Sequence, residues 1–469
     1  MPSCCENLLM SSSKTLIHQL PYYPDSADIF SPLANKPWSI FLDSGDSDSR
    51  LGRFDIIVTD PVCTLVTRGL ETTIVDEQGE RISQEDPFLL IKQCLLARKC
   101  NSDIVPFSGG AMGYFSYDLS RRLESLPAIA LDAENTPDMA VGIYDWAVIV
   151  DHAKQQSWLV SQGMSTKTTD NWDALINQFS PPHEPEDIPV FKVLGDIQSN
   201  MTQAQYEVAF DHIKAYLKEG DCYQVNLAQR FSCQCEGNAW EAYLRLRRIN
   251  SAPYCAYLNL PDVQILSSSP ERFLSVDKGR VETKPIKGTI ARKSGVLENE
   301  AQIETLVNSL KDRAENLMIV DLLRNDISKS CQPGSVKVPK LFAVESFATV
   351  HHLVSTVEGQ LETGLHALDL LRGCFPGGSI TGAPKIRAME IIEELEPNCR
   401  GAYCGSIGYI GYNGNMDTNI AIRTLVYSEN TLRFWAGGGI VNDSVLENEY
   451  QECFDKAQAI FNLLEQLKH

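Results

Sequence analysis

The 469-residue sequence contains no long hydrophobic run and no excess of basic residues. Its longest stretch without a charged side chain, residues 401–416, is shorter than the roughly 20 apolar residues that cross a bilayer, and glycines interrupt it. Lysine and arginine total 41 against 61 aspartates and glutamates, which gives a net charge of −20. So acidic a chain is poorly suited to nucleic acid or to an anionic membrane surface. An anionic small molecule would need cations at its own site.

Zinc-binding and export signals are also missing. The 14 cysteines form no CxxC pair and are irregularly spaced, which argues against a zinc site. The first 15 residues hold no basic segment ahead of an apolar stretch. We therefore expect no signal peptide, reduced thiols and a cytoplasmic location.

Proline marks the clearest change of composition. The segment FSPPHEPEDIPVF, residues 179–191, contains four prolines and three acidic residues, which predicts a linker or an exposed loop. Apolar periodicity predicts helices at residues 87–99, 202–220, 298–323 and 447–467. Runs of β-branched and aromatic residues predict strands at residues 53–59, 144–150, 263–267, 273–276 and 432–436. The expected organisation is a β-rich N-terminal module over residues 1–180 and an α+β module over residues 195–469.

Two predicted helices carry acidic residues spaced three apart. Asp312 and Glu315 lie in KDRAENLMIVDLLRND, and Glu449 and Glu452 lie in DSVLENEYQECFDKA. A spacing of three places each pair on one helical face. Facing pairs would offer the hard oxygen ligands that Mg²⁺ prefers, although a solvated acidic face remains the alternative. A neighbouring apolar stripe predicts that the first pair borders a core; it consists of Leu317, Ile319, Val320 and Leu322.

Glycine-rich segments form a second group. Gly437–Gly439 follow the predicted strand LRFWA, and PGGSITGAPK (residues 376–385) precedes the helical sequence IRAMEIIEEL. Backbone amides in such segments approach anions closely, and a helix N-terminus favours negative charge. Tight turns are the alternative interpretation. Neither segment matches a dinucleotide fingerprint or a GxxxxGK[ST] phosphate loop.

Isolated polar side chains in apolar or turn contexts form the third group. Its members are Glu271 in SSSPERF, Lys287 in KPIKGT, His352 in VHHLVS, Arg423 in IAIRTLV and Lys456 in CFDKA. A buried arginine needs an anionic partner, whereas a lysine between an isoleucine and a glycine also fits an exposed turn. These patterns by themselves predict an α+β enzyme that uses Mg²⁺ on a carboxylate substrate.

Taken together, the motifs resemble those of the chorismate-utilising enzymes. The matching runs are YQVNLAQRF (223–231), SPERF (269–273), PIKGT (285–289), DRAENLMIVDLLRND (312–326), HHLVS (351–355), PGGSITGAPK (376–385), CGSIGY (404–409), DTNIAIRT (417–424), AGGGIV (436–441) and EYQE (449–452). The N-terminal match depends on LDSGDSDSRLGRFDIIVTDP (42–61). The resemblance implies an anthranilate synthase-like α+β fold, in which antiparallel sheets form a central sandwich with helices outside and two subdomains interleave.

Two positions separate the activities within this family. Isochorismate and salicylate synthases carry a water-activating lysine where this chain has Gln224, and anthranilate synthases carry alanine where it has Lys287. The resemblance thus implies amination of chorismate to 4-amino-4-deoxychorismate, on the route to p-aminobenzoate and folate. The alternative enzymatic activity is anthranilate formation. The non-enzymatic alternative is a catalytically silent subunit that only binds chorismate.

The resemblance also implies roles for individual residues. Glu271 would be the general acid, and Lys287 the nucleophile, unless ammonia attacks directly and Lys287 only excludes water. Mg²⁺ would be held by Glu315 and Glu452, with Asp312 and Glu449 behind them. The enolpyruvyl carboxylate would meet Arg423, Tyr403 and the backbone of Gly437, Gly438 and Gly439. The same pocket would be lined by His352, Thr381 and Lys456.

Two further partners follow from the resemblance. The chain contains no G-x-C-x-G nucleophile elbow, so ammonia would come from a separate glutamine amidotransferase subunit in a heterodimer. A tryptophan site would involve Ser44, Leu51, Gly52, Arg53, Phe54, Pro253, Tyr254 and Cys255. Here LDSG replaces a typical LLES and NSAPY replaces NPSPY, which leaves open whether tryptophan binds and whether it regulates.

Overall fold

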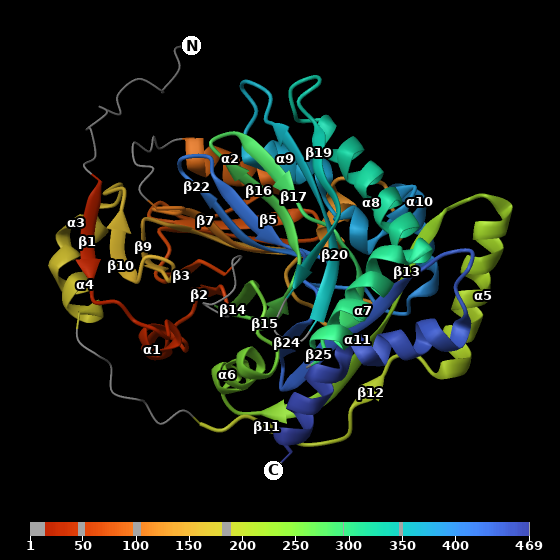
Figure 1. Cartoon of the computed structure of the whole chain (residues 1–469). Coiled ribbons are helices and arrows are strands. Elements are labelled where there is room, and N and C mark those ends of the chain that lie inside the picture. The colour runs from red at the N-terminus through yellow and green to blue at the C-terminus, as the bar shows by residue number, and fades with distance from the viewer. Residues whose placement is uncertain are drawn as a thin grey trace.

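Two large antiparallel β-sheets form the centre of the molecule, and helices cover their outer faces (Figure 1). The computed structural model describes residues 15–45, 52–96, 105–180, 189–293, 295–346 and 350–468. Within these residues, sheet I has thirteen strands and sheet II has twelve. The predicted α+β class with antiparallel sheets is therefore confirmed.

Sheet I runs in the order β1–β10–β9–β3–β2–β14–β15–β24–β25–β13–β11, and β12 and β21 also pair with β13. Its strands are β1 (Leu16–Leu20), β2 (Ser39–Asp43), β3 (Phe54–Val58), β9 (Trp146–Asp151), β10 (Gln156–Ser161), β11 (Lys192–Val193), β12 (Gln198–Ser199), β13 (Gln224–Glu236), β14 (Tyr254–Leu260), β15 (Val263–Ser269), β21 (Gly382–Ala383), β24 (Thr424–Ser428) and β25 (Thr431–Ile440).

Sheet II runs in the order β18–β20–β17–β16–β23–β22–β7–β8–β4–β5–β6, and β19 also pairs with β20. Its strands are β4 (Cys63–Arg68), β5 (Glu71–Asp76), β6 (Gly79–Ser83), β7 (Gly110–Phe115), β8 (Met139–Tyr144), β16 (Arg272–Asp277), β17 (Arg280–Thr283), β18 (Ile286–Ala291), β19 (Lys337–Ser346), β20 (Val350–Gln360), β22 (Ser406–Gly411) and β23 (Met416–Asn419).

Both halves of the sequence contribute strands to both sheets. In sheet I, Leu42 of β2 pairs with Ala256 of β14, and in sheet II, Phe115 of β7 pairs with Ser406 of β22. One apolar core between the sheets includes Ile56 of sheet I and Met112 of sheet II. The two subdomains are interleaved, as expected. Residues 181–188, the centre of the predicted linker, lie outside the described residues, and the domain limits 1–180 and 195–469 remain a prediction.

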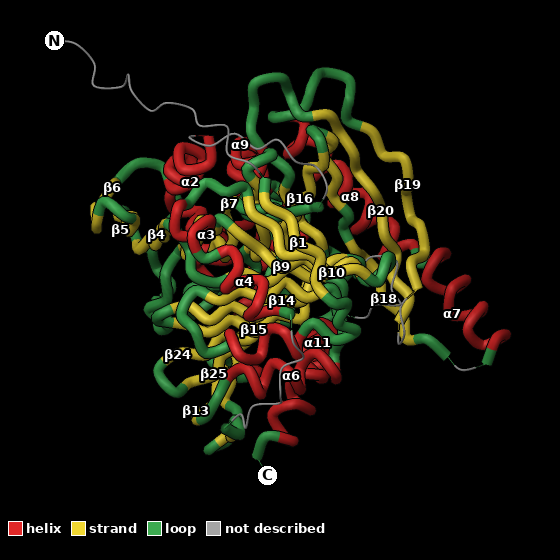
Figure 2. The backbone as a smooth tube through the Cα atoms, turned by 90° about the vertical axis from the view of Figure 1, so that its left-hand side faces the viewer, coloured by secondary structure: helices red, strands yellow, loops and turns green. Residues whose placement is uncertain are grey.

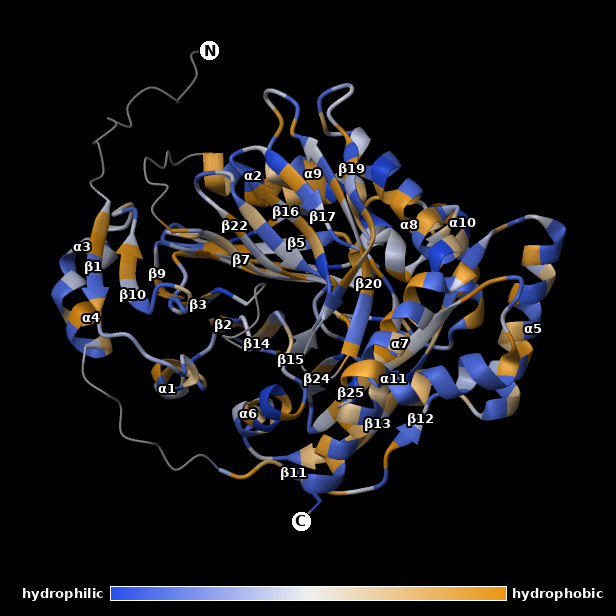
Figure 3. Cartoon of the chain, in the orientation of Figure 1, coloured by the Kyte–Doolittle hydropathy of each residue, from blue (hydrophilic) through white to orange (hydrophobic). Residues whose placement is uncertain are grey.

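Helices pack on both sheets with their apolar sides inward, which the alternating colours of α5 and α11 illustrate (Figure 3). The short helices α3 and α4 lie near the β1 end of sheet I (Figure 2). The helices are α1 (Ala27–Phe30), α2 (Pro87–Leu96), α3 (Thr166–Asp170), α4 (Trp172–Phe179), α5 (Gln203–Glu219), α6 (Ala239–Ile249), α7 (Val296–Asn308), α8 (Leu310–Ser328), α9 (Ala367–Cys374), α10 (Lys385–Leu395) and α11 (Leu446–Gln466), with 3-10 turns at Ser31–Leu33, Tyr117–Arg122 and Gly378–Ile380.

Capping residues explain why one predicted helix was right and another was wrong. Thr202 and Gln205 form a capping box at the start of α5, and Gly220 ends it at φ +87°, which matches the helix predicted over residues 202–220. The single helix expected over residues 298–323 is instead two, α7 and α8. Ser309 adopts an extended conformation between them, and its hydroxyl accepts a hydrogen bond from the Asp312 amide. This serine cap starts a new helix.

Three smaller expectations need correction. The strand predicted at residues 144–150 is divided at Asp145, whose carboxylate accepts hydrogen bonds from the amides of Met164 and Ser165. Gly437–Gly439 lie inside β25 rather than after it. Leu317 is 53% exposed, although Ile319 and Val320 of the predicted stripe are buried. The core-facing side of α8 follows the spacing Asn316, Ile319, Val320, Leu323 and Ile327.

None of the helices in the described ranges is both long and apolar enough to cross a membrane. The cysteines in those ranges are all free thiols.

Candidate active site

The residues predicted for catalysis, metal binding and substrate binding come from several helices and strands and lie near one another. Glu271 lies between β15 and β16, Lys287 lies in β18, and Glu315 lies in α8. Glu452 and Lys456 lie one turn apart on α11. The electrostatic environment of Lys287 includes Glu271, Glu315, Glu452 and Lys456, so the fold brings these five side chains, far apart in sequence, into one group.

Glu271 is a buried carboxyl held by neutral donors. Its side chain accepts hydrogen bonds from the Ser379 hydroxyl, at 2.8 Å from Oε1, and from the Ile286 backbone amide. Burial raises the pKa of Glu271, and the nearby Lys287 ammonium and the Ser379 hydroxyl offset only part of this effect. A carboxyl in this environment retains its proton to higher pH than an exposed one, as a general acid requires.

Lys287 has the opposite tendency. Its Nζ donates a hydrogen bond to the Ser379 carbonyl oxygen at 3.2 Å. Burial lowers the pKa of Lys287, and the carboxylates of Glu315 and Glu271 offset only part of that shift. A lysine whose pKa is lowered has more neutral amine available for nucleophilic attack. The alternative of a solvent-exposed Lys287 in a turn is therefore wrong.

The four predicted metal ligands occupy the facing helices α8 and α11. Glu449 is 2% exposed and accepts a hydrogen bond from Ser444 Oγ at 2.6 Å. Lys311 Nζ lies 3.4 Å from Glu449 Oε1 and 4.0 Å from Glu315 Oε1. An ammonium group thus bridges the two helices.

Glu452 and Asp312 complete this acidic group. Glu452 Oε1 lies 2.6 Å from Lys456 Nζ; burial alone would raise the pKa of Glu452, but Lys456 lowers it below its usual range. Asp312 sits over Gly288, where a Cβ would lie 3.1 Å from the Asp312 carboxyl carbon. The alternative of a purely solvated acidic face is contradicted by the burial of Glu449.

The four carboxylates supply the oxygen ligands that a hard divalent cation prefers, and glycine residues without side chains lie beside them. A Cβ at Gly438 would lie 3.2 Å from Glu449 Oε2 and 3.3 Å from Glu452 Oε1, so the glycine leaves space directly in front of two carboxylate oxygens. In the described part of the chain, no three His, Cys, Asp or Glu side chains are already gathered closely enough to hold a metal ion. Lys311 and Lys456 balance the carboxylate charge instead.

Arg423 is a largely buried cation that forms no ion pair with a carboxylate of the described residues, and its backbone adopts φ +50°. Desolvation therefore lowers its pKa. Burial, with the nearby Arg423 and His351, lowers the pKa of His352 to about 4, and His352 Nδ1 lies 2.8 Å from Thr289 Oγ1. A buried guanidinium beside a neutral imidazole is suited to a carboxylate ligand.

The glycines of β25 are strand residues that permit close packing. Gly437, Gly438 and Gly439 pair with β13, and a Cβ at Gly439 would lie 2.0 Å from the Gln224 side-chain nitrogen. The Gly437 carbonyl accepts a hydrogen bond from Lys456 Nζ at 2.9 Å. The glycines thus let Gln224 approach the strand, and the expectation of a glycine loop after the strand is wrong.

Two of the predicted substrate residues are engaged within the protein. Thr381 is fully buried, and its hydroxyl donates to the Gly377 carbonyl at 3.1 Å. Tyr403 stacks on Trp435, with ring centroids 5.8 Å apart and planes 7° apart. The structure thus gives the Thr381 hydroxyl and the Tyr403 ring partners within the protein.

A separate cavity of about 320 Å³ lies between the two sheets at β2, β14, β16, β22 and β23. Six of the residues predicted for tryptophan line it: Ser44, Arg53, Phe54, Pro253, Tyr254 and Cys255. Gly52 is not part of the lining, and Leu51 falls outside the described residues. The cavity is mostly apolar, with the charged side chains of Asp43, Arg53, Arg272 and Asp417 at its wall.

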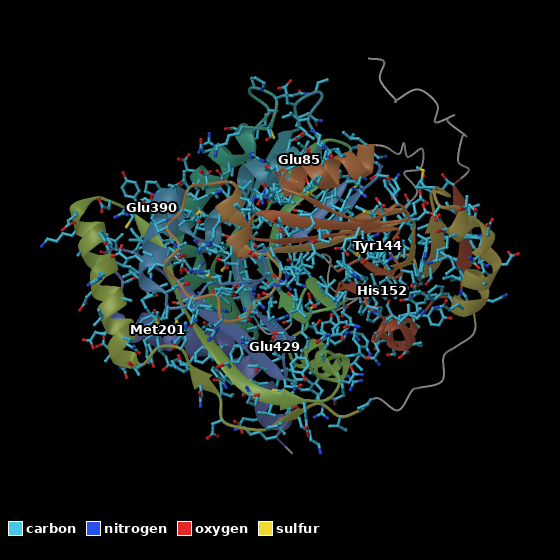
Figure 4. All side chains as sticks on the ribbon, turned by 180° about the vertical axis from the view of Figure 1, so that it is seen from behind. Glu85, Tyr144, His152, Met201, Glu390 and Glu429 are labelled. Carbon is cyan, nitrogen blue, oxygen red and sulfur yellow. The ribbon has the colours of Figure 1, made fainter. Side chains whose placement is uncertain are left out.

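Ser44 connects this cavity to a buried network. Its hydroxyl donates to Asp55 Oδ1 at 2.7 Å, and Asp55 Oδ2 lies 2.8 Å from His152 Nε2. His152, labelled in the view from behind, lies next to α1 (Figure 4). This network holds the serine in a fixed orientation at the cavity wall.

Three residues of the site were missed by the sequence interpretation. Ser379 contacts both Glu271 and Lys287, Thr289 contacts His352, and Lys311 contacts Glu449. Ser379 and Thr289 lie within the matched runs PGGSITGAPK and PIKGT, so their position in those motifs was the available signal. Lys311 offered none, because a lysine beside two helical acids is common on exposed surfaces.

Comparisons with known proteins agree with this geometry. A family model described as chorismate binding enzyme matches residues 39–462. Aminodeoxychorismate synthase component 1 of Salmonella typhimurium is 49% identical over 461 residues, covering 97% of this chain and 100% of that protein, and its Escherichia coli counterpart is 50% identical over 460 residues with the same coverage.

A solved structure supports the fold assignment. Anthranilate synthase component I from Streptococcus pneumoniae superposes with a TM-score of 0.78 at 33% sequence identity, covering 88% of this chain and 92% of that one. The predicted anthranilate synthase-like fold is confirmed. The family model spans most of the sequence, including the lysine, the glutamates and the arginine described above. The chain belongs to the family of chorismate-binding enzymes.

Proposed function

We propose that this chain aminates chorismate with ammonia to form 4-amino-4-deoxychorismate, a precursor of p-aminobenzoate and folate. The observation that carries the proposal is the half-buried Lys287 amine, which shares Ser379 with the buried Glu271 carboxyl. The names and near-complete coverage of the Salmonella and Escherichia coli relatives support the same activity.

Glu271 is the general acid in this proposal. The ring hydroxyl of chorismate departs as water when it receives the Glu271 proton, and the carboxyl must therefore be protonated near neutral pH. Its burial favours that state. Regeneration of the acid takes up the proton that the attacking amine releases.

Lys287 is the nucleophile. Its neutral amine forms a C–N bond to the ring as the C–O bond to the hydroxyl breaks, and ammonia then displaces the lysine to leave the 4-amino product. Direct attack by ammonia, with Lys287 only excluding water, remains the competing route. Gln224 supports amination over hydration in either case, because an amide cannot act as the base that activates water.

Substrate binding depends on separate groups for the two carboxylates of chorismate. Arg423 receives the enolpyruvyl carboxylate, because its largely buried guanidinium has no carboxylate partner among the described residues. His352, Lys456, Tyr403, Thr381 and the strand Gly437–Gly439 form the surrounding wall.

Mg²⁺ is part of the proposal. Glu315 and Glu452 would hold it, with Asp312 and Glu449 behind them, since these carboxylates fit a hard cation. When bound, the ion would neutralise the ring carboxylate of chorismate and offset the negative charge of the site. Lys311 would give up its contacts with Glu449 and Glu315 as the ion enters.

A glutamine amidotransferase is the proposed partner. The relatives are named as one component of their enzyme, and this sequence has no G-x-C-x-G elbow to release ammonia from glutamine. Free ammonium salts should therefore replace the partner in the assay. A cytoplasmic location is also proposed, supported by the free thiols of the described cysteines.

Tryptophan is proposed as the ligand of the cavity between the sheets. The cavity volume and its apolar wall suit an indole, and Ser44 and the charged wall residues suit an amino acid head group.

A product assay tests the main proposal. The isolated chain is incubated with chorismate, Mg²⁺ and ammonium, and products are separated by chromatography for the wild type and for Lys287→Ala. We expect 4-amino-4-deoxychorismate without pyruvate from the wild type and a severe loss of rate in the variant. Fluorescent anthranilate together with pyruvate from the wild type would assign the chain to anthranilate formation, and unchanged chorismate would indicate a silent subunit.

A further inference from the structure

Ser379 contacts both reactive side chains of the site through two different atoms. Its hydroxyl donates to Glu271 Oε1 at 2.8 Å, and its carbonyl oxygen accepts from Lys287 Nζ at 3.2 Å. Ser379 is 7% exposed and Glu271 is 6% exposed, so water competes little for these hydrogen bonds. One residue thus fixes the separation of the acid and the amine.

The hydroxyl contact has a chemical consequence for the acid. The carbonyl oxygen of a carboxyl is the better acceptor, so donation from Ser379 to Oε1 favours the acidic proton on the other oxygen, Oε2. Donation to Glu271 also favours the carboxylate that remains after proton transfer, when negative charge develops on it.

The carbonyl contact has a consequence for the amine. A neutral lysine amine has two hydrogens and one lone pair, and donating one hydrogen to the Ser379 carbonyl limits the directions in which the lone pair points. This contact uses the backbone, so it survives any substitution of the serine side chain. The two functions of Ser379 can therefore be separated experimentally.

The turn that carries Ser379 is itself firmly held. Arg400 Nη1 donates to the Ile380 carbonyl at 3.0 Å, and Thr381 Oγ1 donates to the Gly377 carbonyl at 3.1 Å. Gly378 packs so closely on α8 that a Cβ there would lie 2.6 Å from a Leu322 methyl carbon. A rigid turn is what a positioning group needs, because a shift of about 1 Å is enough to slow a reaction strongly.

We propose that Ser379 is a positioning residue that aligns the Glu271 proton with the departing hydroxyl and the Lys287 amine with the ring. This proposal rests on the proposed function. Other groups also face Glu271: the Lys287 and Lys456 ammonium groups, the Ile286 amide and the Cys404 thiol. Among the described residues that face Glu271, Ser379 alone forms hydrogen bonds with both Glu271 and Lys287.

The test is a graded series of Ser379→Cys and Ser379→Ala in the full-length chain with chorismate, Mg²⁺ and ammonium. The control is Ser161→Ala in β10, which removes another buried serine hydroxyl that donates to a carboxylate, that of Asp145. We expect kcat to fall about 10- to 100-fold in the alanine variant and less in the cysteine variant, with the KM for chorismate changed less than about threefold.

The pH profile provides a readout that a structural role would not move. Without the serine donor, the pKa of Glu271 rises, so the basic limb of kcat/KM shifts to higher pH in Ser379→Ala. Should the limb stay in place and kcat remain within about twofold of the wild type, Ser379 is not a positioning residue. If one variant fails to fold, the other carries the same comparison.

The wild-type reaction separates this inference from the proposed function. If the wild type forms no 4-amino-4-deoxychorismate, the proposed function is wrong. If the wild type forms it and all three variants share its pH profile and rate, only the inference about Ser379 is wrong.

Discussion

Lys311 Nζ lies 3.4 Å from Glu449 Oε1, so an ammonium on the first turn of α8 neutralises a buried carboxylate of α11. The same ammonium lies 4.0 Å from Glu315 Oε1. A lysine thus occupies the position of charge balance that the proposed Mg²⁺ would take. The ion, if it binds there, would compete with Lys311 for the same carboxylates.

Substituting Lys311→Met should make the chain depend more on Mg²⁺ for stability. Glu449 is 2% exposed and would lose its nearest cation, so we expect the metal-free variant to lose about 1 kcal/mol, a figure reduced because Lys311 is half-exposed. Thermal unfolding with and without Mg²⁺ measures this. Lys329→Met is the control, because Lys329 also pairs with a buried acid of α8, Asp326. Equal Mg²⁺ shifts in both variants would contradict the prediction.

Arg423→Met should weaken chorismate use while stabilising the free protein. Losing a guanidinium that pairs with a carboxylate in a buried site should lower kcat/KM about 100-fold. Removing a buried cation without a partner should raise the free energy of unfolding by about 1 kcal/mol in the absence of substrate. Steady-state kinetics and thermal unfolding are measured on the same sample.

The control for Arg423 is Arg372→Met, an exposed arginine that pairs with Asp86. It should leave both quantities nearly unchanged. A lower unfolding temperature for Arg423→Met without substrate would mean that the guanidinium has a structural partner.

L-tryptophan should raise the unfolding temperature through the cavity between the sheets, and Ser44→Ala should weaken that effect. The Ser44 hydroxyl donates its hydrogen to Asp55, which His152 holds in turn, so its oxygen lone pairs are available to accept from the ammonium group of tryptophan. Loss of one hydrogen bond to a charged group should weaken binding about tenfold, which calorimetric titration measures. Ser39→Ala is the matched control on β2, since Ser39 donates to backbone carbonyls away from the cavity. Equal tryptophan affinities in the two variants would exclude this role.

Glu134 should make stability fall as pH rises. Burial raises the pKa of this carboxyl to about 7, and neither of its oxygens has a hydrogen-bond partner among the described residues; Arg230 Nη1 is 3.8 Å away. The folded-state pKa exceeds the unfolded value, so the stabilisation is complete below about pH 4.5 and is lost as pH rises through 7.

Glu134→Gln should remove that pH dependence, worth about 3 kcal/mol between pH 4.5 and 8. Urea unfolding at several pH values measures the slope. Glu124→Gln, an exposed glutamate of the same segment, serves as the control and should retain the wild-type slope. A Glu134→Gln slope identical to that of the wild type would rule out this origin.

The sequence contained more information on local structure than on how elements meet. The Thr202 cap and Gly220 fixed α5, and periodicity placed α11 to within a residue at each end. The break at Ser309 was missed because the apolar spacing continues across it, and only the cap reveals the new helix. The spacing of Asp312, Glu315, Glu449 and Glu452 predicted two acidic faces but not that α8 and α11 oppose each other.

For the site, too, the identity of residues could be predicted but their contacts across elements could not. Motif resemblance selected Glu271, Lys287 and Arg423; the fold buries Glu271 and half-buries Lys287 and Arg423. The contacts of Ser379 and Lys311 could not be predicted, because their partners lie 92 to 138 positions away in the sequence. Gln224 was predicted as a position that separates activities, yet its close approach to Gly439 depends on the register of β13 against β25.

The pairing of β7 with β22 has a consequence for synthesis of the protein. Phe115 leaves the ribosome long before Ser406, its partner in the sheet, exists. One hydrogen-bonding edge of β7 therefore stays unpaired until almost the whole chain has been translated. Long-range strand pairing of this kind is slow and exposes the growing chain to aggregation. Rapid expression should accordingly favour inclusion bodies, and chaperone co-expression or low temperature should recover folded protein.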